Sequence, residues 1–203
     1  MAAGMHVAKP LPFGQLNGIS EKQISEHYSV LYQGYVKKLN EIELKLEAAD
    51  RMQANATYSD LRELKLEEAF ATNAIKLHEE YFSSLGGDGV PSGALADAIA
   101  ADFGSVEKWA EDFKASGLCS RGWVVLAYNW DGRRLHNYSA DYHTQGAWGA
   151  TPLIVLDVYE HAYFLDFATG RKKYVEAYMA NLDWTAANAK FEKLEIAQHR
   201  AGK

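Results

Sequence analysis

The sequence predicts an α+β fold: an N-terminal antiparallel helical hairpin followed by an α/β domain with a small three-stranded antiparallel sheet. The first half of the chain contains two long segments whose apolar residues recur at steps of three and four, the spacing of an amphipathic helix. Beyond Gly89 the pattern changes to runs rich in β-branched and aromatic residues, which are typical of strands, between shorter helical segments. We therefore expect two domains, at residues 1–89 and 90–203, with the functional site between them.

The hairpin should consist of one helix over residues 20–50 and a second from about residue 61 to 85. Ser20 and Gln23 form a capping-box pattern at the start of the first helix. An apolar stripe then follows one face of it, made of Ile24, Tyr28, Leu31, Tyr35, Leu39, Ile42 and Leu46. The glycine-rich run at 86–89 ends the second helix. Two helices of this length joined by a turn should lie antiparallel.

The second half of the chain should contain a β-hairpin, a third strand and four helices. An Asp-Gly turn at 131–132 lies between two strand-like runs, which is the signature of a hairpin. The expected strands are 121–129, 133–142 and 151–159, and the expected helices are 91–104, 105–116, 171–182 and 185–198. Elements segregated in this way along the chain indicate an α+β architecture rather than an alternating parallel sheet.

The composition excludes several classes of protein. The 203 residues are 48% hydrophobic and 24% charged, as in ordinary globular proteins, and the formal net charge is −6. A negative chain is a poor general binder of nucleic acid, because phosphate contacts need basic surface. The sequence has neither a signal-peptide core nor a run of about 18 apolar residues. We therefore expect a cytoplasmic protein without a membrane partner.

Several chemistries lack their motifs in this chain. The single cysteine, Cys119, excludes a disulfide framework, a cysteine-based zinc site and a cysteine-ligated iron–sulfur cluster, and we expect it to be a small buried residue. The phosphate loops GxGxxG and GxxxxGK[ST], the metal motif HExxH and the serine-hydrolase motif GxSxG are also missing. These absences leave the histidines as the candidates for chemistry.

Four side chains stand out as a candidate metal site. His27 and His78 lie on or beside the apolar faces of the two long helices, although either alone is more often a hydrogen-bonded core histidine. Asp157 and His161 follow an apolar run, where unpaired charge is unfavourable. In a continuing strand these two would be about 13 Å apart, so they converge only if the strand ends near Asp157 and the chain turns. Three imidazoles and a carboxylate suit zinc, iron or manganese.

The run "DVYEHAYFLDF" at 157–167 resembles the Asp-Val-Trp-Glu-His-Ala-Tyr signature of the iron/manganese superoxide dismutase family. The likeness extends across nearly the whole chain. Further segments in the family's order and spacing are "LPF", "EHYSVLYQGYVKKLN", "DFGSVEKW", "RGW" and "NLDW". The resemblance implies the same fold that the periodicity predicts, a helical hairpin followed by an α/β domain.

The resemblance implies that His27, His78, Asp157 and His161 hold one iron or manganese ion per subunit, with a bound water or hydroxide completing the site. The implied reaction is the disproportionation of superoxide anion into oxygen and hydrogen peroxide, with the metal alternating between its trivalent and divalent states. The sequence does not separate iron from manganese, because both use the same ligands. The family is oligomeric, so the resemblance implies a homodimer or tetramer.

The same resemblance assigns roles around the ion. Tyr35 matches a tyrosine that guards the substrate channel and helps proton transfer, and Trp123 matches a tryptophan in the pocket wall. Glu160 matches a glutamate that reaches His161 of the partner subunit. Arg171 matches an arginine of the substrate funnel, although a solvated charge at a helix start is nearly as good an interpretation.

One further group should hydrogen-bond the bound solvent. The family places a Gln four residues before the second ligand, or a Gln or His in the loop after the β-hairpin. Ala74 occupies the helix position here and cannot do this, so the loop residues His143 and Gln145 are the candidates. His143 is preferred because its spacing from Asp157 is nearer to that of the family.

The chain departs from the family pattern near the expected site. These departures are Leu31, Leu77, Val125, Tyr159 and Phe164, and they bear on proton delivery and rate rather than on the ligands. Leu31 and Phe164 replace the two ends of one hydrogen bond, which suggests a coordinated change. Two alternatives stay open: a metal-binding protein on the same scaffold with little or no dismutase activity, and a zinc hydrolase with Glu79 as its only candidate base.

Overall fold

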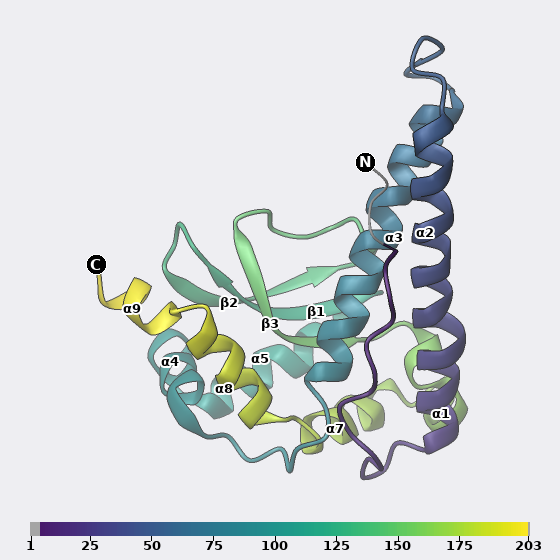
Figure 1. Ribbon diagram of the computed structural model, residues 1–203. Coiled ribbons are helices and arrows are strands. Elements are labelled where there is room, and N and C mark those ends of the chain that lie inside the picture. Colours follow the sequence, from purple (N-terminus) through teal and green to yellow (C-terminus); the bar gives the residue numbers. More distant parts are fainter. Residues whose placement is uncertain (1–4, 203) are drawn as a thin grey trace.

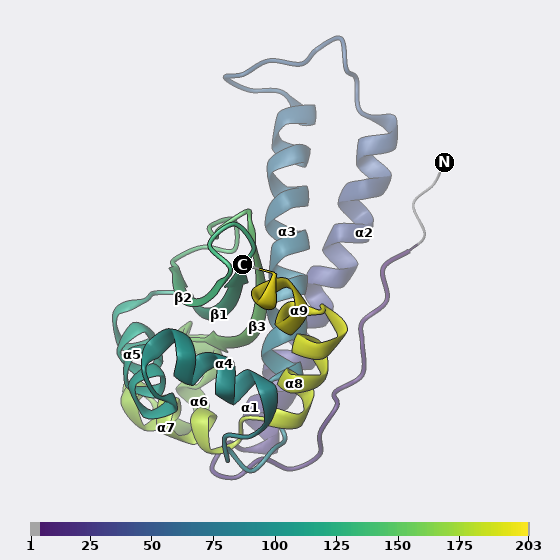
Figure 2. The same ribbon diagram turned by 90° about the vertical axis from the view of Figure 1, so that its left-hand side faces the viewer.

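The computed structural model describes residues 5–202, and it confirms the predicted α+β fold. A helical hairpin forms the first part, and a three-stranded antiparallel sheet with surrounding helices forms the second (Figure 1). The tip of the hairpin projects away from the sheet, as Figure 2 shows from the side. Within the described residues, no helix is long and apolar enough to cross a membrane.

The first arm of the hairpin is a continuous run of helix with a wider turn inside it. Helix α1 (Glu21–Ser25) leads into the π-helical segment η1 (Glu26–Tyr32), which leads into α2 (Gln33–Ala48). In η1 the backbone hydrogen bonds reach one residue further than in an α-helix, and such turns are frequent at functional sites. The predicted long helix over residues 20–50 is therefore present as one continuous run, but residues 26–32 within it are π-helical, which was not predicted.

The π-helical segment shifts the buried stripe by one residue. Tyr32 and Val36 are buried, whereas the predicted stripe members Tyr28, Leu31 and Tyr35 are only half-buried. The wider turn rotates the positions around Tyr32 and Val36 by one residue, and the predicted stripe resumes at Leu39, Ile42 and Leu46, which are buried. This rotation leaves the half-buried tyrosines free to present their hydroxyl groups to other parts of the molecule.

The second arm, α3 (Asp60–Ser83), agrees with the predicted helix from about 61 to 85. Ser59 caps it by accepting a hydrogen bond from the backbone N–H of Arg62. Beyond the helix, the chain passes so close to the second part that only glycine fits: a Cβ at Gly87 would lie 2.3 Å from the carbonyl oxygen of Leu182. This approach fixes the foot of the hairpin against the rest of the protein.

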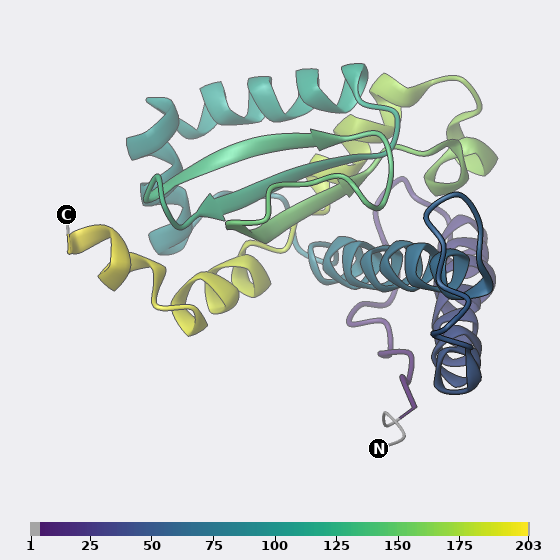
Figure 3. The same cartoon turned by 90° about the horizontal axis from the view of Figure 1, so that it is seen from above.

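The sheet has strand order β2-β1-β3 and is antiparallel throughout. Its strands are β1 (Trp123–Asn129), β2 (Arg134–Ala140) and β3 (Ala150–Asp157). The central strand β1 is almost wholly buried, and its first residue, Trp123, pairs with the last residue of β3, Asp157. Seen from above, α5 (Val106–Cys119) covers one face of the sheet and α3 lies along the other (Figure 3).

The remaining helices are α4 (Gly93–Phe103), η2 (Glu160–Ala162), α6 (Phe164–Phe167), α7 (Arg171–Ala180), α8 (Trp184–Lys193) and α9 (Ile196–Ala201). The predicted helix at 185–198 is wrong in its continuity, because Glu195 adopts a left-handed conformation with φ 53° and separates α8 from α9. Cys119, expected to be buried, is exposed at the end of α5. The strand β3 ends at Asp157, and the chain then turns into η2.

Candidate metal centre

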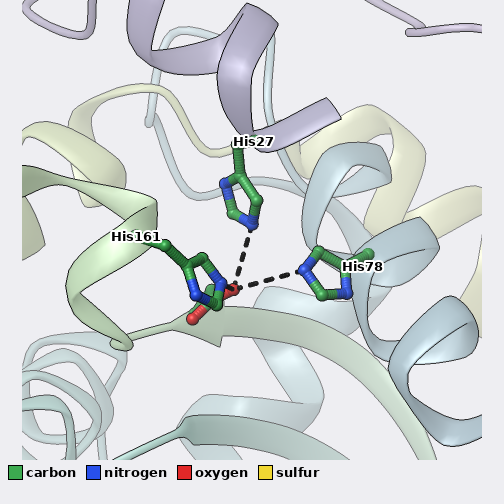
Figure 4. Close-up of side chains that lie close together, drawn as sticks. His27, His78 and His161 are labelled. Atoms are coloured by element: carbon green, nitrogen blue, oxygen red, sulfur yellow. Dashed lines mark hydrogen bonds and ion pairs between the residues drawn. The ribbon is translucent and has the colours of Figure 1, made fainter. Parts of the chain in front are cut away.

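Four elements that are far apart in sequence bring their polar side chains to one point. His27 comes from the π-helical segment η1, His78 from near the C-terminal end of α3, Asp157 from the end of β3 and His161 from the short helix η2. Figure 4 shows the three imidazole rings turned toward one another, and the carboxylate of Asp157 lies between them within 3.8 Å of each Nε2 atom. Asp157 and His161 are four residues apart in sequence, and they meet because the strand ends at Asp157 and the chain then turns.

The four side chains are close enough to share one ion. One nitrogen or oxygen atom from each of them lies within 4.8 Å of all the others. The Oδ2 atom of Asp157 is 3.1 Å from Nε2 of His27, 3.1 Å from Nε2 of His161 and 3.8 Å from Nε2 of His78. Only His161 reaches solvent, with 29% of its side chain exposed.

The ring of His78 shows why this cluster requires a cation. Its Nδ1 atom lies 2.7 Å from the carbonyl oxygen of Ala74, so Nδ1 carries the proton and donates it. In the neutral ring the lone pair of Nε2 then faces the carboxylate of Asp157, and among the described residues Nε2 has no hydrogen-bond partner. A buried lone pair opposite a buried carboxylate is unfavourable unless a positive ion lies between them. The residues therefore fit a metal ion.

The pKa shifts of His27, His78 and Asp157 favour the protonation states that bind metals, whereas that of His161 favours the charged ring, which would release its proton to bind an ion. Burial, with the neighbouring His27, lowers the pKa of His78 to about 3, and burial likewise lowers the pKa of His27 against the opposing effect of Asp157. Burial alone would raise the pKa of Asp157, but the charges and hydrogen bonds of His161 and His27 hold it well below its usual range. Burial disfavours the charged form of His161, yet the carboxylate outweighs it and raises the pKa. Neutral imidazoles and an ionised carboxylate are the forms that bind metals.

Comparison with known proteins identifies the family. The chain is 41% identical over 199 residues to "Superoxide dismutase [Fe]" of Aquifex aeolicus (strain VF5). The aligned region covers 94% of this chain and 93% of that protein. The chain belongs to the iron/manganese superoxide dismutase family. It is also 44% identical over 181 residues to "Superoxide dismutase [Fe]" of Cupriavidus metallidurans, covering 87% and 90% of the two chains. "Superoxide dismutase [Mn] 1" of Halobacterium salinarum is 36% identical over 183 residues, covering 86% and 88%.

The family model that matches describes the C-terminal domain of iron/manganese superoxide dismutases and covers residues 91–190. This segment contains Asp157 and His161 but neither of the two helical histidines. The full-length relatives span the remainder, including His27 and His78. The resemblance seen in the sequence is therefore confirmed over both parts of the chain.

Gln23 supports the metal centre from behind, a role that the sequence did not reveal. Its side chain is fully buried, donates to the carbonyl of His161 at 2.7 Å and accepts from the N–H of Leu165 at 3.1 Å. Ser20 does accept from the backbone N–H of Gln23, so the serine half of the predicted capping box is present. The glutamine half is wrong, because the side chain of Gln23 holds the turn that carries His161. In the sequence, Gln23 is only a polar residue three positions after a capping serine, which gives no signal for this role.

A chain of hydrogen bonds runs along the edge of the cluster from Trp123 to Tyr35. The indole Nε1–H of Trp123 donates to Nδ1 of His143 at 3.0 Å, and Nε2 of His143 lies 3.1 Å from the hydroxyl of Tyr35. An indole nitrogen can only donate, so Nδ1 of His143 accepts and the neutral ring carries its proton on Nε2. Nε2–H therefore donates to the oxygen of Tyr35, whose own hydrogen is left for another acceptor. The Tyr35 and His143 rings lie 5.6 and 6.0 Å from the ring of His78.

The two loop candidates occupy different environments. His143 is buried beside the cluster, where burial lowers its pKa to about 4 and keeps the ring neutral. Gln145 is exposed, and its side-chain oxygen accepts from the backbone N–H of Asp141 at 2.6 Å. The loop thus turns His143 toward the metal centre and Gln145 toward its own backbone.

Glu160 and Arg171 lie outside the cluster in this chain. Glu160 is exposed at the start of η2. The guanidinium of Arg171 is partly buried, donating to the carbonyl of Ser120 at 2.8 Å and to the hydroxyl of Tyr163 at 3.2 Å. Arg171 is therefore engaged with the protein rather than freely solvated at its helix start.

The residues that depart from the family pattern divide into two groups. Three lie near the site: the ring of Tyr159 stacks on His161 with 5.2 Å between centroids, and Leu77 and Val125 line one pocket together with His143. Leu31 and Phe164 reach solvent instead, with 47% of Phe164 exposed. Their expected contact near a subunit interface stays a prediction.

Proposed function

We propose that this chain is a superoxide dismutase, which converts two superoxide anions and two protons into one oxygen and one hydrogen peroxide. The cofactor is one iron or manganese ion, held by His27, His78, Asp157 and His161. The observation that carries the proposal is the unpartnered Nε2 of His78 facing a buried carboxylate, in a chain whose relatives are named for this reaction.

The side chains of the site hold the ion and exclude water from it. When bound, an iron or manganese ion supplies one-electron chemistry between its divalent and trivalent states. Aromatic rings enclose the ligands: Tyr81 and Phe82 lie 5.0 and 5.1 Å from the ring of His27, and Trp123 lies 5.1 Å from that of His78. A low-dielectric surrounding strengthens the attraction between the site and an anionic substrate.

Tyr35 and His143 are proposed to supply protons. Burial, with the charge of Asp157, raises the pKa of Tyr35, so its hydroxyl keeps its hydrogen at neutral pH. Because the oxygen of Tyr35 accepts from Nε2–H of His143, the hydroxyl hydrogen is oriented away from that ring. Tyr35 is half-buried, so its Oη–H can donate a proton to a superoxide anion that has entered the site and been reduced there. We propose His143, rather than Gln145, as the loop group that acts on solvent there, and it acts through its hydrogen bond to Tyr35, because both of its ring nitrogens are already engaged.

Two charged residues near the site, Glu160 and Arg171, bear on the subunit assembly and on the approach of substrate. Glu160 is an exposed carboxylate close to the solvent-reaching edge of His161, a placement that suits a homodimer in which it accepts from His161 of the partner subunit. Arg171 is proposed to add positive charge to the substrate funnel. We also propose a cytoplasmic location and a division into domains 1–89 and 90–203, each contributing two of the four ligands.

The function is tested on full-length protein from its native host, because overexpression can load the wrong metal. Metal analysis should find iron or manganese, and rapid-mixing kinetics should show superoxide consumed with one hydrogen peroxide formed for every two anions. Bound iron or manganese without turnover would leave only a metal-binding protein. Zinc as the native metal would contradict the proposal.

A further inference from the structure

Glu79 is an almost buried carboxylate that follows His78 directly in α3 and takes no part in the ligand cluster. Only 8% of its side chain is exposed. It accepts hydrogen bonds from Nζ of Lys9 at 2.6 Å, from the hydroxyl of Tyr32 at 3.2 Å and from Nζ of Lys76 at 3.3 Å. A carboxylate is seldom retained at such a position unless several donors compensate its desolvation.

The contacts of Glu79 tie three segments of the chain together. The backbone N–H of Lys9 donates to the oxygen of Tyr32 at 2.9 Å, so the hydrogen of that hydroxyl is the one given to Glu79. The carbonyl of Lys9 accepts from the hydroxyl of Tyr28 at 2.7 Å. The N-terminal segment therefore lies along the hairpin, as Figure 1 shows, and is fastened to both arms. We call Lys9, Tyr32 and Glu79 the clasp.

The clasp lies directly behind two of the ligands. The ring of Tyr32 is 1% exposed and stacks beside the ring of His78, with 6.4 Å between centroids and 30° between planes. Tyr32 is also the last residue of the π-helical segment in which His27 stands. Glu79 therefore accepts a hydrogen bond from Tyr32, whose ring packs on His78. The backbone of Tyr32 ends the π-helical segment that carries His27.

We propose that Glu79 is a positioning residue of the metal centre: through Tyr32 it fixes the ring of His78 and the spacing between the two helical arms that carry His27 and His78. The inference rests on the proposed function only in requiring that the cluster holds a metal. Removing a residue that hydrogen-bonds or orients a metal ligand commonly lowers metal affinity by about tenfold or more. Because the clasp contains neither a ligand nor a group that meets substrate, metal retention is the property it should control.

The test uses the manganese-loaded full chain and follows release of manganese to excess EDTA, together with the visible absorption of the oxidised manganese form. Glu79→Leu should release manganese about tenfold faster than the parent and shift the absorption band. Tyr32→Phe, which keeps the ring and removes only the hydroxyl, should change both readouts in the same direction. Glu79→Gln retains a hydrogen-bond acceptor and should stay within about threefold of the parent rate.

Asp102 provides the matched control. Its side chain is 14% exposed, it pairs with Arg200 at 2.9 Å, and it lies on α4 in the other part of the protein. Asp102→Leu should lower the melting temperature without changing manganese release or the absorption band. Equal release rates for Glu79→Leu and Asp102→Leu, with unchanged spectra, would overturn the proposal. A parent protein that retains no manganese or iron would overturn the proposed function as well, a result that is distinct from failure of the clasp alone.

Discussion

Replacing Gln23 by Leu tests the support behind His161, because leucine has a similar size and lacks both polar atoms. The substitution leaves the His161 carbonyl without its donor at 2.7 Å and the Leu165 N–H without its acceptor at 3.1 Å. An unsatisfied buried polar group costs about 1–3 kcal/mol. Leu165 is 55% exposed, so water can replace its lost partner, and the carbonyl contributes most of the effect.

We therefore expect the free energy of unfolding to fall by about 2 kcal/mol. For a chain of this size that loss lowers the melting temperature by roughly 4–8 °C. Urea unfolding of the metal-free protein measures the first quantity, and metal analysis of the loaded protein should show reduced occupancy. Gln53→Leu, at an exposed position near the tip of the hairpin, is the control and should leave stability within about 0.5 kcal/mol. A Gln23→Leu protein that matches this control in stability and metal content would refute the reasoning.

Four further predictions concern the site. His78→Ala should lose the metal and all dismutase activity, and retention of either at the parent level would remove this residue from the ligand set. His143→Ala should keep the metal but shift its reduction potential and slow turnover, and an unchanged potential measured by redox titration would count against its role. Glu160→Ala should weaken both the dimer and metal retention, which sedimentation and metal analysis would show together. Acidification should destabilise the metal-free protein: the pKa of His78 is lowered from 6.5 to about 3, so the unfolded chain takes up a proton first and stability is lost as the pH falls from 6.5 toward 3. Unfolding midpoints that stay constant across this window would contradict that sign.

The sequence predicts the elements better than it predicts their details. Apolar spacing identifies both arms of the hairpin, and runs of β-branched and aromatic residues on either side of an Asp-Gly turn identify β1 and β2, because local patterns dominate there. The π-helical segment could not be predicted in this way, because one added backbone residue in a turn does not change the composition. It nevertheless places Tyr32 rather than Leu31 in the core. Glu195 likewise breaks a helix at a residue that is not a glycine.

The same limit applies to the site. Family resemblance supplies the four ligands because they are residues with a fixed motif and order. The connections around them depend on tertiary approach: Trp123 meets His143 across the end of the sheet, and Gln23 meets His161 across the whole chain. The sequence marks Glu79 only as a candidate base next to a ligand, because its link to Lys9 requires the N-terminal segment to fold back along the hairpin.

The most direct test of the account is anomalous X-ray scattering from crystals of the native-host protein, recorded on either side of the iron and manganese absorption edges. The account predicts one strong peak at one of these two edges, located between Nε2 of His27, His78 and His161 and Oδ2 of Asp157. A peak that appears only at the zinc edge, or one that lies away from these four atoms, would contradict it.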